Sequence, residues 1–153
     1  MPLDTPRLPL DEQVAALNDR YRHHSATDVL EHALFDAAVG NLALVSSFGA
    51  ESVVLLHLVS VISPGTPVLF IDTRMLFDET LAYQRDLAAS LNLTDIRIIR
   101  ADRRDIDRHD ADATLNRSKP DACCALRKIV PLERALEHFD GWITGRKRFQ
   151  AGA

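Results

Sequence analysis

Short apolar runs alternate with longer amphipathic segments through the middle of the chain. The runs are rich in residues that favour strands, and they occupy 42–45, 67–71, 96–99 and 142–144. Between them, residues 51–62 are apolar on nearly all sides, and residues 78–91 carry apolar side chains on one face, with Asp78 as a candidate cap. Alternating strands and helices predict an α/β fold with an open, mostly parallel sheet and helices on both faces.

The amino-terminal residues have a helical pattern of their own. Residues 11–24 show apolar positions three or four apart, and residues 29–39 do the same after Thr27, which we expect to cap that helix. We therefore expect residues 1–40 to form a helical segment packed on a domain that spans residues 41–153.

Two segments in the last third of the chain are less regular. Residues 102–119 are charged and poorly periodic, so we expect a mobile surface segment there. Residues 122–139 have a helical pattern that contains Pro131. Because proline cannot donate a backbone hydrogen bond inside a helix, we expect a kink or two short helices.

Composition excludes several classes of protein. A chain of 153 residues with 46% hydrophobic and 26% charged residues has the composition of one globular domain. The net charge of -4 provides no general attraction to nucleic acid or to an anionic membrane. The longest apolar run, 53–62, is shorter than the roughly 18–20 residues of a membrane span, and the proline-rich start does not resemble a signal peptide. We expect a cytoplasmic protein.

Polar clusters follow three of the predicted strands. They lie at residues 46–52, 71–80 and 144–148. Because the carboxyl ends of parallel strands meet at one edge of a sheet, we expect the clusters to line one cleft. The candidate ligand-binding residues are Ser46, Ser47, Phe48, Gly49, Ser52, Asp72, Thr73, Arg74, Leu76, Gly145, Arg146 and Arg148.

Each of these clusters also fits a simpler interpretation. Serines before a helix, together with a glycine, suit an anion-binding turn, but Ser47 or Ser52 can equally cap an ordinary helix. Asp72 and Thr73 can meet a ribose or only cap a helix. The cations at residues 146–148 can contact an anion or form a solvated basic run.

The only two cysteines are adjacent, at Cys123 and Cys124, and cannot staple the fold together. Arg127 and Lys128 follow them. Thiolates are the ligands of iron–sulfur clusters, and nearby cations lower the pKa of thiols and offset the charge of such a cluster. Two ligands are half of the usual four, and on its own such a pair is more often two inert buried thiols.

Taken together, four segments resemble the adenylyl-sulfate and phosphoadenylyl-sulfate reductase family, in order along nearly the whole chain. They are S-S-F-G-A-E-S-V-V-L-L-H-L at 46–58, I-D-T-R-M-L-F-D-E-T at 71–80, P-D-A-C-C-A-L-R-K-I-V-P-L at 120–132 and W-I-T-G-R-K-R at 142–148. The first is similar to the modified PP-loop of the family. The resemblance implies an adenine nucleotide alpha hydrolase-like fold and an adenine nucleotide at the predicted cleft.

The tandem cysteines carry the most specific implication of this resemblance. In the family, a C-C pair followed by R-K marks members that hold a four-iron four-sulfur cluster and usually prefer adenylyl sulfate (APS), and members without it prefer the 3′-phosphorylated substrate (PAPS). The resemblance therefore implies that Cys123 and Cys124 are cluster ligands supported by Lys128. The implied activity is reduction of APS to sulfite and AMP by thioredoxin, in assimilatory sulfate reduction and cysteine biosynthesis.

Three positions depart from the related motifs. Phe48 and Glu51 replace the first glycine and the aspartate of the S-G-G-x-D-S loop of ATP pyrophosphatases, whereas its first serine, second glycine and last serine are matched by Ser47, Gly49 and Ser52. The altered loop implies nucleotide binding without cleavage of ATP. Arg74 stands where the family most often has glycine, so either the turn differs or Arg74 contacts the substrate.

The resemblance also implies residues that these 153 residues do not contain. Family members continue beyond the T-G-x-R-R segment with a C-x-x-C pair, which completes the cluster, and with a tail cysteine, which is the nucleophile. We therefore expect the amino-terminal portion of an APS reductase that binds substrate without reducing it, has no catalytic nucleophile, holds two of the four cluster ligands and can form homo-oligomers. The alternatives are a PAPS reductase, a non-catalytic adenine-nucleotide-binding module, and an ATP pyrophosphatase, which Phe48 and Glu51 disfavour.

Overall fold

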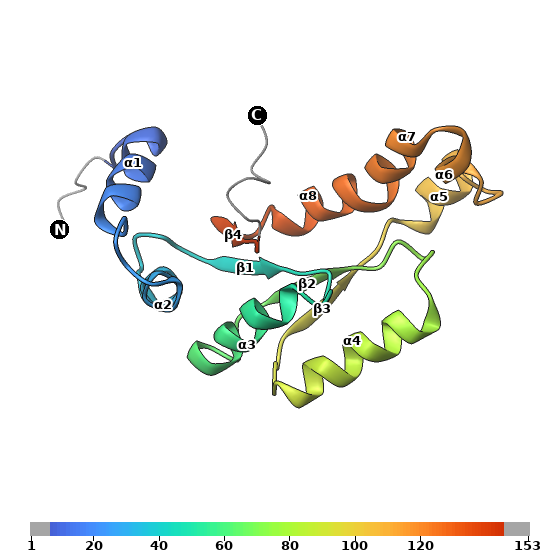
Figure 1. Ribbon diagram of the computed structural model, residues 1–153. Coiled ribbons are helices and arrows are strands. Elements are labelled where there is room, and N and C mark those ends of the chain that lie inside the picture. The colour runs from blue at the N-terminus through green and yellow to red at the C-terminus, as the bar shows by residue number, and fades with distance from the viewer. Residues whose placement is uncertain (1–6, 146–153) are drawn as a thin grey trace.

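The computed structural model describes residues 7–145, and in this range the chain forms one sheet with helices on both faces (Figure 1). The strands of this described part are β1 (Leu42–Val45), β2 (Val68–Ile71), β3 (Ile96–Ile99) and β4 (Gly141–Ile143). All neighbours pair in parallel, in the order β3-β2-β1-β4. The predicted α/β class and parallel sheet are confirmed.

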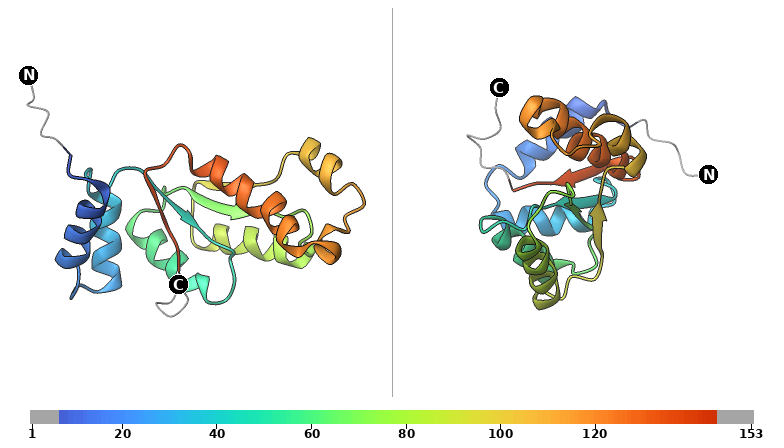
Figure 2. Two further views of the ribbon diagram at one scale, coloured as in Figure 1. Left: turned by 90° about the horizontal axis from the view of Figure 1, so that it is seen from above. Right: turned by 90° about the vertical axis from the view of Figure 1, so that its right-hand side faces the viewer.

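The helices form two layers and a separate pair, as two further views show (Figure 2). One face of the sheet is covered by α3 (Ser52–Ile62) and α4 (Asp78–Ser90). Across the other run α7 (Pro120–Cys124), the π-helix η1 (Ala125–Ile129) and α8 (Val130–Leu136), with α5 (Arg103–His109) and α6 (Leu115–Ser118) beside α7. At the amino ends of the strands lie α1 (Leu10–Arg20) and α2 (Ala26–Phe35). No described helix is long and apolar enough to span a bilayer.

The core lies mainly between the sheet and α3. Leu44, Val68 and Phe70 on the two central strands are buried, as are Leu56 and Val59 on α3. Central parallel strands are covered on both faces, which is why their sequences read as continuous apolar runs. Each such side chain contributes about 1.5–3 kcal/mol to stability through burial. This packing holds β1 and β2 in place, and both strands end at the candidate site.

Helix ends differ from the sequence-based expectations. The predicted helix 29–39 is α2, which is capped by Ser25, whose side-chain oxygen accepts a hydrogen bond from the Asp28 backbone N–H at 3.2 Å. Thr27 lies inside that helix. Asp78 is the first residue of α4 and does not cap it, since Phe77 occupies the N-cap position without a side-chain hydrogen bond. The spacing of apolar residues predicts which face of a helix is buried. It does not predict the N-cap, which is the residue just before the first one with helical backbone angles.

Residues 102–119 are more regular than expected. The predicted mobile segment forms α5 and α6. Asp102 caps α5 by accepting a hydrogen bond from the Arg104 N–H at 2.8 Å. The Asp110 carboxylate accepts one from the Leu115 N–H at 2.9 Å, at the start of α6. Acidic side chains that bind backbone N–H groups thus order a charged segment whose apolar period is too weak to reveal helices.

The segment around Pro131 forms two short α-helices, as expected, but a π-helical turn joins them. Pro131 is the second residue of α8, and the chain runs from α7 through η1 into α8 without interruption (Figure 1). A proline inside an α-helix clashes with the carbonyl four residues earlier, here that of Arg127. The wider π-helical turn over Ala125–Ile129 lies at that position and takes up the misfit.

The starts of β1 and β4 are joined around one glycine. Gly40 has φ +89°, and a Cβ atom there would lie 2.3 Å from Asp140 Oδ2 and 2.8 Å from Asp140 Cβ. The same Asp140 oxygen accepts a hydrogen bond from the Asn41 N–H at 2.7 Å. Glycine is therefore required at position 40 by both backbone angle and space.

We expect Gly40→Ala to lower the free energy of unfolding by about 2–3 kcal/mol, measured by urea denaturation. Left-handed backbone costs a residue with a Cβ about 1–2 kcal/mol, and the displaced Asp140 loses a hydrogen bond of about 1 kcal/mol. Gly65→Ala is the control, because its φ is not positive and its new Cβ would lie 3.8 Å from Thr94 Oγ1. Equal stability of the two variants would contradict this role of Gly40.

Candidate functional site

A cavity of about 310 Å³ lies at the carboxyl ends of β1 and β2. Its walls come from the two strand ends, the loop after each strand, the first turn of α4 and the π-helix. The lining residues are Val45, Ser46, Ser47, Phe70, Ile71, Thr73, Leu76, Thr80 and Lys128. Apolar walls with a few convergent polar groups are typical of a small-molecule site.

The predicted site residues occupy different places around this cavity. Ser46, Ser47, Thr73 and Leu76 line it, together with Lys128. Six other predicted residues are described but are not among the lining residues: Phe48, Gly49, Ser52, Asp72, Arg74 and Gly145. Gly145 follows β4, and a Cβ there would lie 3.4 Å from Leu55 Cδ2 of α3. Arg146 and Arg148 lie outside the described residues.

The loop after β1 is shaped by its own serines. Ser46 Oγ accepts a hydrogen bond from the Phe48 N–H at 3.1 Å, and Ser47 Oγ accepts one from the Gly49 N–H at 3.4 Å. Helix α3 starts at Ser52, directly after the loop. The partial positive charge of a helix N-terminus therefore lies next to the serines, an arrangement that favours an anion.

Phe48 explains how this loop tolerates the loss of a glycine. Its φ is +58°, in the left-handed region where a residue with a Cβ is strained by about 1–2 kcal/mol. Its side chain is only 2% exposed and packs edge-to-face on Phe70, with ring centroids 5.5 Å apart. Burial of an aromatic ring is worth about as much as the strain costs, so the turn keeps a glycine-like shape with a phenylalanine in it.

Asp72 braces the loop after β2. Its Oδ1 accepts a hydrogen bond from the Arg74 backbone N–H at 2.8 Å, and its Oδ2 accepts one from Arg100 Nε at 2.9 Å. Burial by itself raises the pKa of this carboxyl. The two hydrogen bonds and the charges of Arg100 and Arg74 outweigh burial and hold the pKa below its usual value. Asp72 is thus an ionised brace behind the cavity wall.

Arg74 lies in the left-handed region of backbone angles, which favours glycine. Its φ is +62°, so the turn is of the glycine type and arginine is strained in it. Whether the exposed Arg74 side chain contacts a substrate stays a prediction.

Arg127 links the cysteine-bearing helix to the cavity. Its side chain is 5% exposed, Nη1 donates to the Thr73 carbonyl oxygen at 2.7 Å, and Nη2 donates to Asp110 Oδ2 at 2.7 Å. Nε donates to the same carboxylate oxygen at 3.2 Å. The sequence indicated Arg127 as a cation near the thiols, but it did not indicate Asp110 or Arg100. Asp110 is 17 positions from its partner Arg127, and Arg100 is 28 positions from its partner Asp72, so no local pattern marks either pair.

The two cysteines differ in their surroundings. Cys123 is buried and Cys124 is exposed, as expected of neighbouring positions on a helix. Among residues 7–145, no group of three or more His, Cys, Asp or Glu side chains could hold a metal ion. Thiols have the right chemistry for an iron–sulfur cluster, but the residues present supply half of a four-thiolate donor set. They do not form a complete cluster site on their own.

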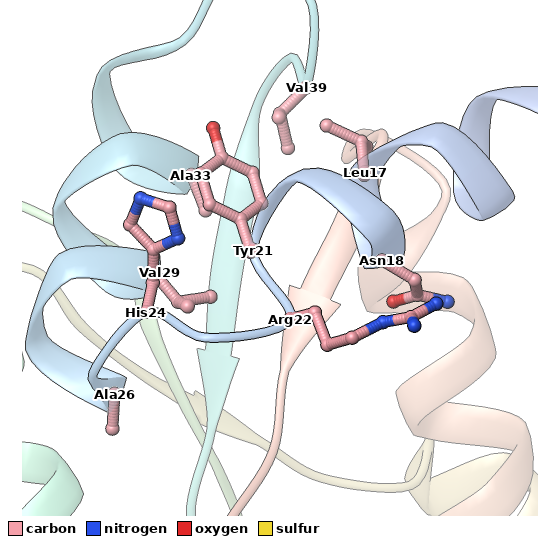
Figure 3. Close-up of a pocket in the computed structure, with 9 residues that line it drawn as sticks. All are labelled: Leu17, Asn18, Tyr21, Arg22, His24, Ala26, Val29, Ala33 and Val39. Carbon is pink, nitrogen blue, oxygen red and sulfur yellow. The ribbon is translucent and has the colours of Figure 1, made fainter.

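A larger cavity lies elsewhere, between α1 and α2 (Figure 3). Its volume is about 620 Å³. Tyr21 and His24 stand side by side on one part of its wall, with ring centroids 5.3 Å apart, and Arg22 and Asn18 lie together on another. It is at the amino end of the sheet, away from the loops that follow the strands. Size alone therefore does not make it the candidate site.

We expect Arg74→Gly to raise the free energy of unfolding by about 0.5–1 kcal/mol in urea denaturation. Relief of left-handed strain, about 1–2 kcal/mol, exceeds the entropic cost of glycine, about 0.5–1 kcal/mol. Asn92→Gly is the control, because Asn92 has φ +55° but asparagine tolerates this region, so its stability should change little. A less stable Arg74→Gly would instead mean that the arginine side chain makes stabilising contacts.

Comparison with known proteins agrees with this geometry. The family model for the phosphoadenosine phosphosulfate reductase domain matches residues 41–153. Adenosine 5′-phosphosulfate reductases of Mesorhizobium japonicum and a Chelativorans species are 41% and 40% identical to this chain over 139 and 146 residues. These matches cover 91% and 94% of this chain but 55% and 60% of those proteins.

A solved structure is also similar. The crystal structure of phosphoadenylyl-sulfate (PAPS) reductase from Candida auris, a phosphate complex, matches with a TM-score of 0.74 and 26% identity, over 95% of this chain and 72% of that one. The chain thus spans somewhat more than half the length of the curated relatives, and its fold is that of a solved reductase. The chain belongs to the phosphoadenosine phosphosulfate reductase domain family.

Proposed function

We propose that this chain is the nucleotide-binding, amino-terminal part of a thioredoxin-dependent APS reductase. The observation that carries the proposal is the cavity at the ends of β1 and β2, where the side chains of Ser46, Ser47, Thr73 and Lys128 converge in a member of this family. Hydroxyl groups, a lysine and a nearby helix N-terminus are the groups that bind a phosphate or sulfate ester.

Within this site, the two halves of the nucleotide would meet different walls. The apolar wall formed by Val45, Phe70 and Leu76 suits the adenine ring. The serine loop and Lys128 suit the phosphosulfate group. In support, the related Candida auris structure is described as a phosphate complex. The predicted contacts of Arg146 and Arg148 with the anion remain part of this proposal.

The reaction itself would use groups beyond the described residues. By family resemblance, a cysteine thiolate attacks the sulfur of APS, the bond between sulfur and the phosphate oxygen breaks, and AMP leaves with the bonding electrons. The resulting enzyme thiosulfonate is reduced by the dithiol of thioredoxin, which releases sulfite and becomes a disulfide. The described residues would bind the AMP leaving group and position the sulfur.

We also propose that the protein is cytoplasmic, that it self-associates, and that residues 1–40 form a segment separate from the domain that begins at residue 41.

An iron–sulfur cluster is the proposed cofactor. Cys123 and Cys124 would supply two of its thiolate ligands, and Lys128, which lines the cavity, would supply a positive charge near the substrate anion. A cluster bound there places positive side chains around a negatively charged group. The remaining ligands must come from outside these 153 residues or from a second chain.

A PAPS reductase is the second candidate, favoured by the Candida auris neighbour, whereas the tandem cysteines and the named relatives favour APS. Calorimetric titration of the chain with APS and with PAPS separates the two. Tighter binding of APS supports the proposal, and tighter binding of PAPS supports the alternative. A chain that binds neither would contradict both.

We expect Lys128→Ala to weaken AMP binding about 10- to 150-fold in calorimetric titration, because a charge-assisted hydrogen bond contributes about 1.5–3 kcal/mol. Lys119→Ala is the matched control, since Lys119 is exposed at the start of α7 and does not line the cavity. Its AMP affinity should equal that of the unchanged chain. Equal losses in the two variants would mean a general charge effect and not a contact.

We expect anaerobic reconstitution of the 153-residue chain with iron and sulfide to yield well under four iron atoms per chain. Only two cysteines are present, and a four-iron cluster uses about four thiolates. Iron analysis combined with light scattering checks this, because two chains can pool their cysteines in a dimer. Cys124→Ser should abolish whatever iron is retained. A full cluster in a proven monomer would contradict the ligand assignment.

A further inference from the structure

Three segments far apart in the sequence meet at one buried guanidinium group. Arg127, on the π-helix, contacts the Thr73 carbonyl at the end of β2 and the Asp110 carboxylate between α5 and α6. The side chains of Arg127 and Asp110 are 5% and 1% exposed. Asp110 also accepts a hydrogen bond from the Leu115 N–H, so both of its oxygens are in use. We call these three groups the Asp110–Arg127–Thr73 bridge.

The residues on either side of this bridge form the two walls of the candidate site. Thr73 lines the cavity from the β2 side, and Lys128, the next residue after Arg127, lines it from the helix side. The span between Thr73 and Lys128 therefore depends on how Arg127 is held. A guanidinium group can donate hydrogen bonds in two directions at once. Its orientation is fixed only when an acceptor binds one of its sides.

Asp110 provides this acceptor. Its carboxylate accepts two of the guanidinium hydrogen bonds. These hydrogen bonds, the backbone hydrogen bonds and the Arg127 charge outweigh burial and hold the pKa of Asp110 below its usual value. Without that carboxylate, Arg127 would be a buried and unpaired charge, which is unfavourable enough to make the side chain move. Movement of Arg127 would release the Thr73 carbonyl and shift the π-helix that carries Lys128.

We propose that Asp110 is a positioning residue for the nucleotide site. It acts through Arg127, fixes the separation of Thr73 and Lys128, and makes α5 and α6 part of the support of the site. The inference rests on the proposed nucleotide function, because the bridge has a ligand to position only if the cavity binds one. Asp110 itself does not line the cavity and needs no contact with substrate.

The test is a calorimetric titration of Asp110→Asn with AMP. Its dissociation constant is compared with that of the unchanged chain under conditions where both proteins are folded to the same extent. We expect the dissociation constant to rise about five- to thirtyfold, as for residues that couple to a site through a network. Asp105→Asn is the matched control. Asp105 lies on α5, the helix that Asp110 follows, and forms a partly exposed ion pair with Arg134 at 3.5 Å, so its replacement should leave the affinity unchanged.

Two further variants keep the test decisive. Arg127→Lys retains the positive charge beside Asp110, but lysine has no planar guanidinium group that could contact the Thr73 carbonyl at the same time. If Asp110→Asn does not fold, we expect the same loss of AMP affinity in Arg127→Lys. A double variant should lose no more affinity than the weaker-binding single variant, because the two residues act as one unit. Folded single variants with unchanged AMP affinity would overturn the proposal, as would fully additive losses.

A second readout separates this inference from the nucleotide function. In a Cys124→Ser background only Cys123 can react, and Cys123 is buried four positions before Arg127. If the bridge holds this helix, Asp110→Asn should raise the rate of iodoacetamide labelling about tenfold by local opening, while Asp105→Asn should not. If the unchanged chain binds no AMP, the proposed function fails, and this labelling alone decides: faster labelling supports the bridge and equal labelling overturns it.

Discussion

Parallel pairing of β1 with β2 is the constraint on which the rest of this molecule depends. Leu44 is aligned with Val68, and Val45 with Leu69. β2 continues for two residues past the pairing of Val45 with Leu69, and the loops that follow the two strands place Ser46, Ser47 and Thr73 on one cavity. A register shift would separate the serine hydroxyls from Thr73 and turn the buried apolar side chains to the wrong face.

Two residues at this edge of the sheet are strained, because they have left-handed backbone angles that favour glycine. Phe48 and Arg74 both have left-handed backbone angles, one in each loop beside the cavity. The cost at Phe48 is met by burial of its ring on Phe70, and that at Arg74 by the hydrogen bond from its N–H to Asp72. Strain of this kind persists where the surroundings determine the conformation, and functional sites are where it concentrates.

The strands and the polar clusters behind them were predictable because their signals are local. The apolar run 42–45 and the run 96–99 are strands with those bounds, and the segments after β1 and β2 form the cavity. The ordering of residues 102–119 was not predictable, since it depends on Asp110 meeting Arg127, and a charged segment has many equivalent partners in sequence. Pro131 correctly predicted two short helices, but the π-helical turn between them was not predictable, because it has no sequence period of its own.

The π-helix also determines where this protein can change its length. A π-helical turn is an α-helix with one residue more than the regular period needs, so it sets the angle between the two ends of the helix. Deleting one residue between Cys124 and Pro131 would remove this extra residue and leave an ordinary α-helical turn, in which the proline ring clashes with a backbone carbonyl. The spacing between the thiol pair and Pro131 therefore has to include the extra residue that lets the helix accommodate the proline.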